Sequence, residues 1–175
     1  MSFKGTFTAL ITPFDKNGDI DFDNLKKLVE RQILAGIDGV VPVGTTGESP
    51  TLNTSEHLKV IQEVVKIVNK RCQVIAGTGA NSTAEAVELT LAAKSFGVDG
   101  TLQVTPYYNK PNDEGLIRHF SKIADIGVPV VLYNVPGRTS KEISLEVIKE
   151  LSKHKNIVSI KEASGTVENL SLIHI

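Results

Sequence analysis

Six short apolar runs recur along this chain of 175 residues, and stretches with helical periodicity separate them. The runs are Phe7–Ile11, Gly39–Val43, Gln73–Ala76, Gly100–Val104, Pro129–Tyr133 and Ile157–Lys161. They are apolar almost throughout rather than alternating, which is typical of parallel strands covered on both faces. One strand with its helix takes about 30 residues, the size of a right-handed βαβ unit. The pattern therefore predicts an α/β fold built from one repeated unit.

Helices are expected between the runs because the intervening segments carry start and stop signals. Asn53 and Ser82 are each followed three residues later by a glutamate, which is the spacing of a capping box. The expected helices are Asp23–Ala35, one opened by Asn53, one opened by Ser82 and ended by Gly97, Asp113–Ala124 and Ser144–Lys153.

A repeated strand–helix unit fits either a (β/α)8 TIM barrel or an open, doubly wound sheet. The chain lacks a glycine-rich dinucleotide fingerprint, which argues against the nucleotide-binding form of the second. A complete barrel usually needs about 250 residues, and six strands are visible here. We therefore expect an incomplete TIM barrel of the first six strand–helix units over residues 1–170.

Composition excludes several classes of protein. The net charge is −1 and no basic block is present, so nucleic acid is not an expected partner. Cys72 is the single cysteine, which leaves no internal disulfide or multi-cysteine zinc cluster. The chain begins without a signal-peptide pattern, and no apolar stretch approaches the length of about 20 residues that a membrane helix needs. We expect no membrane association and a cytoplasmic protein.

Polar side chains stand where the apolar runs end. Lys161 closes the sixth run, and a lysine there would lose hydration, so its pKa would fall and its amine could form a Schiff base with a ketone. Thr45, Thr46, Tyr108, Tyr133 and Arg138 also lie at or just beyond strand ends. Parallel barrels place their chemistry at that end of the sheet.

Each of these residues also has a plainer interpretation. Lys161 could extend to solvent, Tyr133 could be an ordinary buried tyrosine, and Arg138 could lie on the surface. Gly44–Ser49 could be a capped turn, although its backbone N–H groups and hydroxyls could also hold a carboxylate. Three histidines fall in expected helices, where we predict solvated faces, and no metal site can be assembled: His57, His119 and His154.

Five motifs resemble the dihydrodipicolinate synthase family. They are GTTGES at Gly44–Ser49, GTGAN at Gly77–Asn81, TPYYNKP at Thr105–Pro111, YNVPGRT at Tyr133–Thr139 and IKEASG at Ile160–Gly165. The lysine and the tyrosine are shared with a wider group of pyruvate-dependent class I aldolases that includes N-acetylneuraminate lyase. Arg138 in its YNVPGRT context is the more selective mark of the synthases.

The resemblance implies a lyase of lysine and diaminopimelate biosynthesis. Lys161 would form an imine with pyruvate and then an enamine, which would attack L-aspartate 4-semialdehyde to give 4-hydroxy-tetrahydrodipicolinate. Tyr133 would move protons, relayed through Thr45 and through Tyr108 of a neighbouring subunit in a homotetramer, with no metal and no other cofactor. Thr46 would hold the pyruvate carboxylate and Arg138 the carboxylate of the aldehyde.

The resemblance also implies a site for feedback inhibition by lysine, formed by Ser49, His57, Asn81, Glu85 and Tyr107. Residues 171–175 depart from the family and resemble a translated adapter, so we treat them as a non-family tail. Six strands cannot close a barrel, so we expect this chain by itself to be poorly soluble or inactive. Two alternatives stay open: another pyruvate-dependent aldolase such as N-acetylneuraminate lyase, and a non-catalytic binding barrel.

Overall fold

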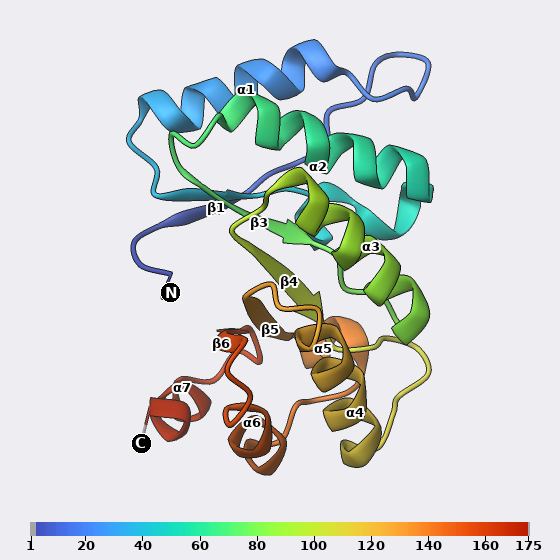
Figure 1. Cartoon of the computed structure of the whole chain (residues 1–175), viewed down its shortest axis with the longest axis vertical. Helices are drawn as coiled ribbons and strands as arrows, with labels where there is room; N and C mark the ends of the chain where they lie inside the picture. The colour runs from blue at the N-terminus through green and yellow to red at the C-terminus, as the bar shows by residue number, and fades with distance from the viewer. Residues whose placement is uncertain (1–2, 175) are drawn as a thin grey trace.

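The computed structural model describes residues 3–174 and contains one curled, parallel six-stranded sheet (Figure 1). The strands are β1 (Phe7–Ala9), β2 (Gly39–Val41), β3 (Gln73–Gly77), β4 (Gly100–Val104), β5 (Val130–Asn134) and β6 (Ile157–Glu162), and they pair in chain order. Every pairing is parallel. The predicted fold class, an incomplete (β/α)8 barrel with six strand–helix units, is confirmed.

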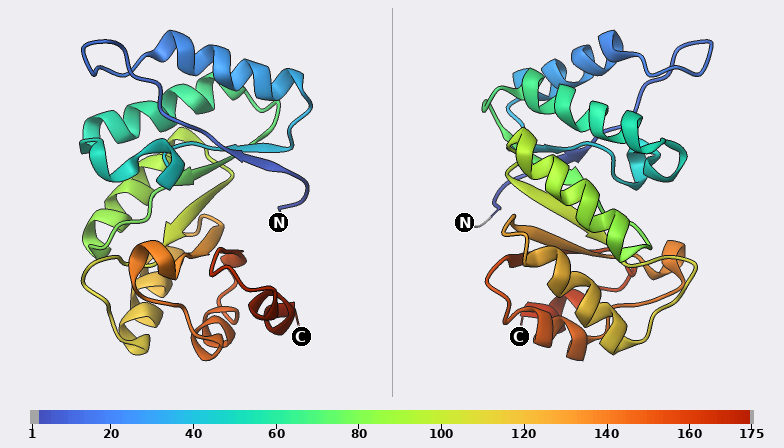
Figure 2. Two further views of the ribbon diagram at one scale, coloured as in Figure 1. Left: turned by 180° about the vertical axis from the view of Figure 1, so that it is seen from behind. Right: turned by 45° about the vertical axis from the view of Figure 1, so that its right-hand side comes forward.

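The helices cover one face of the sheet, and the concave inner face is left open (Figure 2). They are α1 (Phe22–Leu34), α2 (Thr54–Val68), α3 (Thr83–Phe96), α4 (Asp113–Ala124), α5 (Pro136–Thr139), α6 (Leu145–Leu151) and α7 (Val167–His174), with 3-10 turns η1 (Thr45–Gly47) and η2 (Ser49–Thr51). Neighbouring helices pack in sequence, α1 on α2, α2 on α3, α3 on α4 and α4 on α6. Within residues 3–174, a helix with the length and apolar character of a membrane span is absent.

Helix starts follow the capping signals in the sequence. The Asn53 side chain accepts the N–H of Glu56 at 3.0 Å, and the Glu56 carboxylate accepts the N–H of Asn53 at 2.9 Å, a complete capping box. Ser82 makes half of such a box, since its hydroxyl accepts the N–H of Glu85 at 3.4 Å. These contacts satisfy backbone N–H groups that a helix cannot pair internally.

Two apolar layers hold the sheet. The outer layer, between the sheet and the helices, includes Leu25, Val40 and Val64 at one end and Phe120 and Leu132 at the other. The inner layer on the concave face is much smaller and consists of Ile75, Leu102, Val131, Tyr133 and Val135, with partly buried neighbours. The outer layer therefore supplies most of the buried apolar surface, and the inner face is available for a site.

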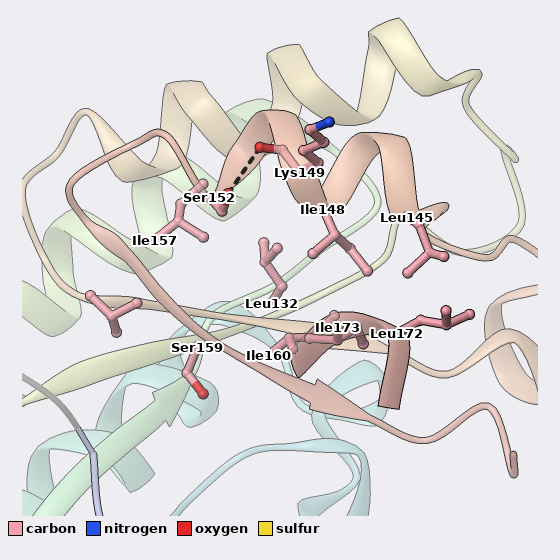
Figure 3. A pocket seen from close by; sticks show the side chains of 11 residues that line it. Leu132, Leu145, Ile148, Lys149, Ser152, Ile157, Ser159, Ile160, Leu172 and Ile173 are labelled. Carbon is pink, nitrogen blue, oxygen red and sulfur yellow. Dashed lines mark hydrogen bonds between the residues drawn. The ribbon is translucent and has the colours of Figure 1, made fainter. Parts of the chain in front are cut away.

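The two outermost strands are less covered than predicted. All five residues of β5 are buried, whereas β1 is only partly buried and β6 alternates between partly buried and exposed residues. The expectation of strands covered on both faces is therefore wrong for β1 and β6, because each has a neighbouring strand on one side only. An apolar groove of about 590 Å³ also opens between β6, α6 and α7 (Figure 3).

Some element boundaries differ from those expected. Strands β1 and β2 end two residues earlier than predicted, and Arg138 lies in the short helix α5, which the sequence analysis did not anticipate. Residues 171–174 continue α7, which starts at Val167. Residue 175 lies outside the described residues, and the origin of the 171–175 tail stays a prediction.

Candidate active site

Lys161 and Tyr133 lie side by side on the inner face of the sheet. They are direct partners in the parallel pairing of β5 with β6. The Lys161 Nζ lies 4.4 Å from the centroid of the Tyr133 ring, close enough for a cation–π contact when the amine is protonated. The predicted neighbourhood of the two residues is therefore present in the structure.

Lys161 is more exposed than predicted. The nitrogen was expected to be held dry, but the side chain is exposed because the inner face is open beside β6. Partial burial still lowers the pKa of Lys161 below its ordinary value of 10.5, since desolvation disfavours the ammonium form. The lowered pKa favours the neutral, reactive amine. The expectation that the Lys161 nitrogen is shielded from water is wrong, as far as residues 3–174 show.

Tyr133 is held firmly from the neighbouring strand. It is 6% exposed, and its carbonyl oxygen accepts two hydrogen bonds of 3.0 Å, from the N–H and from the hydroxyl of Thr105. These bonds tie the end of β5 to the end of β4. The backbone at Tyr133 is therefore fixed, and the low exposure of the side chain restricts the ring.

Thr45 lies near Tyr133 because a strained turn follows β2. Thr45 and Tyr133 line the same small cavity of about 20 Å³. Two residues before Thr45, Val43 has a φ of 52°, in the left-handed region that β-branched residues rarely adopt. Gly77 permits the close approach of β3, because a Cβ there would collide with the Val43 carbonyl group. Backbone strain of this kind is concentrated at functional sites.

The other predicted residues lie at the strand exits but on exposed surface. Thr46 and Arg138 are exposed, the first in η1 and the second in α5. Tyr108 is 91% exposed with a φ of 72°, so its phenol does not reach Tyr133 of the same chain. The structure thus brings Lys161, Tyr133 and Thr45 to the inner face, and leaves Thr46, Tyr108 and Arg138 around it.

A second pocket of about 80 Å³ lies between η2, α2, α3 and the loop after β4. Four of the five residues expected to bind lysine line it: Ser49, His57, Glu85 and Tyr107. Asn81 supports the pocket from outside, since its side-chain N–H donates to the Tyr107 carbonyl at 3.3 Å. Burial, and then the charge of Glu85, raise the pKa of Tyr107.

Two histidines contradict the prediction of solvated faces. His57 is 5% exposed with its Nε2 2.7 Å from the Gly77 carbonyl oxygen, and His119 is 4% exposed with its Nδ1 2.8 Å from the Thr83 hydroxyl. Burial lowers the pKa of both. Their helical spacing contained the signal, because each lies on the apolar stripe of its helix. His154 lies just beyond α6 and is only partly buried.

Asn134 is a residue that the sequence analysis missed. It is 1% exposed at the end of β5, directly after Tyr133, and its side chain donates to the Glu162 carboxylate at 2.8 Å. Asn134 lies in the YNVPGRT motif and Glu162 in the IKEASG motif, but neither motif indicated the contact, because it joins residues on two different strands. Across residues 3–174, no group of three or more His, Cys, Asp or Glu side chains is arranged to hold a metal ion.

The sequence pattern of the dihydrodipicolinate synthetase family matches residues 2–175. The 4-hydroxy-tetrahydrodipicolinate synthase of Geobacter metallireducens is 55% identical over 172 residues, which cover 98% of this chain and 59% of that relative. The synthase structure from Methylacidiphilum fumariolicum SolV superposes with a TM-score of 0.96 at 52% identity, covering 99% of this chain and 58% of that one.

A third similar protein is the Acinetobacter baumannii dihydrodipicolinate synthase complexed with pyruvate. It is 50% identical, with a TM-score of 0.94, and the match covers 97% of this chain and 59% of that one. The chain spans about 59% of the length of the curated relatives that it matches. With the whole described fold shared and the family pattern matched from residue 2 to residue 175, this chain belongs to the dihydrodipicolinate synthetase family.

Proposed function

We propose that this chain carries the reactive lysine of a pyruvate-dependent lyase that forms 4-hydroxy-tetrahydrodipicolinate in lysine and diaminopimelate biosynthesis. The observation that carries the proposal is the position of Lys161 beside Tyr133 on the inner face, with the lysine pKa lowered. A lowered pKa increases the share of neutral amine, which is the form that attacks a ketone. The names of the similar synthases, one of them complexed with pyruvate, support the same reaction.

The chemistry follows from the amine. The Lys161 Nζ forms a C–N bond with the keto carbon of pyruvate, and the keto oxygen leaves as water to give an imine. Loss of a methyl proton turns the imine into an enamine, whose carbon attacks the aldehyde carbon of L-aspartate 4-semialdehyde. The amino group of that substrate then attacks the imine carbon, which closes the ring and breaks the C–N bond to Lys161, so the free amine is returned. Tyr133 removes and returns protons, and Thr45, which lines the same small cavity, relays them. In this scheme neither a metal nor an organic cofactor takes part.

The substrate carboxylates and the partner subunit occupy the rim of the inner face. Thr46 binds the pyruvate carboxylate, and Arg138 binds the carboxylate of the aldehyde through its planar guanidinium. Tyr108, exposed on its loop, extends the proton relay of a neighbouring copy in a cytoplasmic homotetramer. Its positive φ supports this role, since the loop holds the ring away from its own chain.

The second pocket is proposed as a site for feedback by lysine. Glu85 offers a carboxylate for the ligand's ammonium groups, while Ser49, His57 and Tyr107 line the remaining wall and Asn81 supports it. Calorimetric titration with L-lysine tests the assignment. Binding that is lost in Glu85→Gln supports it, and unchanged binding in that variant contradicts it.

Borohydride trapping tests the central proposal. The chain, fused to the C-terminal region of the Geobacter metallireducens synthase so that the barrel is complete, is incubated with pyruvate, reduced and digested, and the peptide containing Lys161 is examined by mass spectrometry. We expect a reduced pyruvate adduct on Lys161, none in Lys161→Ala, and an unchanged adduct in the matched control Lys149→Ala, which removes an exposed lysine. An adduct that is absent, or that appears on other lysines equally, contradicts the proposal.

A second experiment tests the aldehyde substrate. The chain spans about 59% of the length of its relatives, so turnover is measured for the chain and for a fusion to the C-terminal region of the Geobacter metallireducens synthase. Consumption of L-aspartate 4-semialdehyde in preference to N-acetylmannosamine supports the synthase. The reverse preference would assign the protein to the N-acetylneuraminate lyase type of aldolase.

A further inference from the structure

Strand β6 contains one residue more than its pairing with β5 requires. Val130 pairs with Ile157, but Val131 pairs with Ser159, so Val158 has no partner on β5 and forms a bulge. Beyond the bulge the pairing is regular and sets Tyr133 opposite Lys161 and Asn134 opposite Glu162.

The bulge decides which way Lys161 points. Ile157 packs in the outer apolar layer and lines only the outer groove, whereas Lys161 lines only the open inner cavity, together with Val131. Ser159 and Ile160 border both spaces, and Ile160 packs against the outer layer. Figure 3 shows Ile157 directed toward α6 and Ser159 directed to the opposite side of the strand. In a regular strand, residues four apart face the same way, so Ile157 and Lys161 could not lie on opposite faces without an extra residue between them.

A competing register is available to this sequence. If Val158 paired with Val131, β6 would be regular, Ile160 would lie opposite Tyr133, and Lys161 would lie opposite Asn134. Asn134 is 1% exposed beneath the helices, so Lys161 would then point into the helix layer and away from the inner face. A slip of one residue turns every side chain of a strand to the other face, and here it would remove the amine from the site.

Two side chains hold β6 in the bulged register. The Asn134 amide donates to one Glu162 oxygen at 2.8 Å, and the N–H of Ser164 donates to the other at 2.7 Å. Asn134 is itself fixed, because its side-chain oxygen accepts the N–H of Ile143 at 3.0 Å and its carbonyl accepts the N–H of Ala163 at 2.8 Å. A slip would move Glu162 by about 3.3 Å along the strand, too far for these bonds to survive.

We propose that Asn134 and Glu162 are positioning residues, whose hydrogen bond keeps β6 in the bulged register and so directs Lys161 into the barrel beside Tyr133. The inference rests on the proposed function, in which Lys161 is the reacting amine. A hydrogen bond to a charged group is strong enough to change the ratio of two registers about tenfold or more. Burial of Ile160 on the outer face favours the same register, so the experiment must separate the two contributions.

The test measures the reactivity of Lys161 without pyruvate. The folded chain is methylated briefly with formaldehyde and cyanoborohydride, and the label on Lys161 is compared with the label on the exposed Lys149 in the same digest. In Asn134→Leu, which keeps the side-chain volume and removes the hydrogen bond, we expect the Lys161-to-Lys149 ratio to fall about tenfold. If Asn134→Leu does not fold, Glu162→Leu replaces it in the experiment. This variant removes the same hydrogen bond, and Glu162 is only partly buried.

Asn156→Leu is the matched control. Asn156 is an asparagine at the opposite end of β6 whose side chain donates to the Ala124 carbonyl at 2.8 Å. We expect this variant to lose stability while its Lys161 labelling stays that of the unmodified chain. Equal loss of labelling in Asn156→Leu and Asn134→Leu would mean that general loosening of the strand, rather than register, controls Lys161.

Deletion of Val158 should restore the labelling of Lys161 in Asn134→Leu. Such a rescue is not expected if Asn134 acts only on the stability of the fold. Without Val158, regular alternation itself places Ile157 outward and Lys161 inward, so the hydrogen bond is no longer needed to choose the register. Asn134→Leu combined with the deletion should therefore recover Lys161 labelling. If labelling in Asn134→Leu is already normal, or if the deletion leaves it low, the positioning role is refuted.

The two proposals fail in different ways. If Lys161 is methylated, and this labelling falls in Asn134→Leu, but no pyruvate adduct forms, the proposed function is refuted and the register mechanism stands. If the unmodified chain and Asn134→Leu trap pyruvate on Lys161 to the same extent, the proposed function stands and the positioning role of Asn134 is refuted.

Discussion

Acidification should destabilise this fold through one buried side chain, His119. The imidazole is 4% exposed, its Nδ1 lies 2.8 Å from the Thr83 hydroxyl, and its Nε2 has no partner among residues 3–174. Burial lowers the pKa of His119 from 6.5 to about 4, because desolvation disfavours the imidazolium form. Protonation of this residue therefore favours the unfolded chain.

The expected magnitude follows from the difference in pKa. Well above pH 6.5 His119 is neutral in both states, so it adds no pH dependence there. Between pH 6.5 and about 4 the unfolded chain binds the proton first, and the free energy of unfolding falls by about 1.4 kcal/mol per pH unit as the pH decreases. At about pH 5 the loss is about 2 kcal/mol, equivalent to a decrease in Tm of about 4–8 °C for a domain of this size.

Thermal unfolding followed by circular dichroism at about pH 7.5 and about pH 5 measures this loss. His119→Asn places an amide where Nδ1 lies, so it can keep the contact with Thr83 but cannot titrate. We expect its Tm to decrease on acidification by about 4–8 °C less than that of the unmodified chain. His174→Asn, at an exposed histidine, should behave like the unmodified chain. Equal acid sensitivity in all three proteins would refute the role of His119, since other titrating groups are common to them.

Three further predictions concern capping, close packing and the proton relay. Asn53→Ala removes the 3.0 Å side-chain half of a capping box and should lower the free energy of unfolding in urea by about 1 kcal/mol, whereas Ser82→Ala should cost less because its hydrogen bond is 3.4 Å long; equal losses would contradict this ranking. Gly77→Ala drives a Cβ into the Val43 carbonyl group and should destabilise by about 1–3 kcal/mol or more in the same assay. Gly137→Ala, whose Cβ would meet nothing within 4 Å, is its control and should be nearly neutral. Tyr133→Phe keeps the ring against Lys161 but removes the phenolic hydroxyl, so turnover with the aldehyde should fall about 10²–10⁴-fold while borohydride trapping of pyruvate persists; unchanged turnover would contradict a role of the hydroxyl in proton transfer, and loss of trapping would mean that imine formation itself needs the hydroxyl.

Much of the fold could be predicted from local pattern. The bounds of β4 and α4 agree with the expected ranges, because an uninterrupted apolar run and a capped amphipathic helix are properties of the chain alone. The early ends of β1 and β2 could not be anticipated. Near β2, the positive φ of Val43 turns the chain before the apolar run ends, and nothing in a valine indicates that conformation.

The candidate site was predicted in part. Parallel order along the chain already placed Tyr133 next to Lys161, since consecutive strands of such a sheet are neighbours. The burial of His57 and His119 was missed, because polarity was given more weight than position on the helix. The exposure of Lys161 was also missed, since it depends on how far the inner face is covered.

The sequence by itself determined the repeated strand–helix unit, the parallel order of the strands and the residues that stand at their exits. The direction of Lys161 was decided by tertiary structure alone. Simple alternation along β6 would place Ile157 and Lys161 on the same face, yet the unpaired Val158 and the Asn134–Glu162 hydrogen bond separate them. Register belongs to a pair of strands and not to either one, so which face of the sheet receives the amine is settled only when β5 and β6 come together.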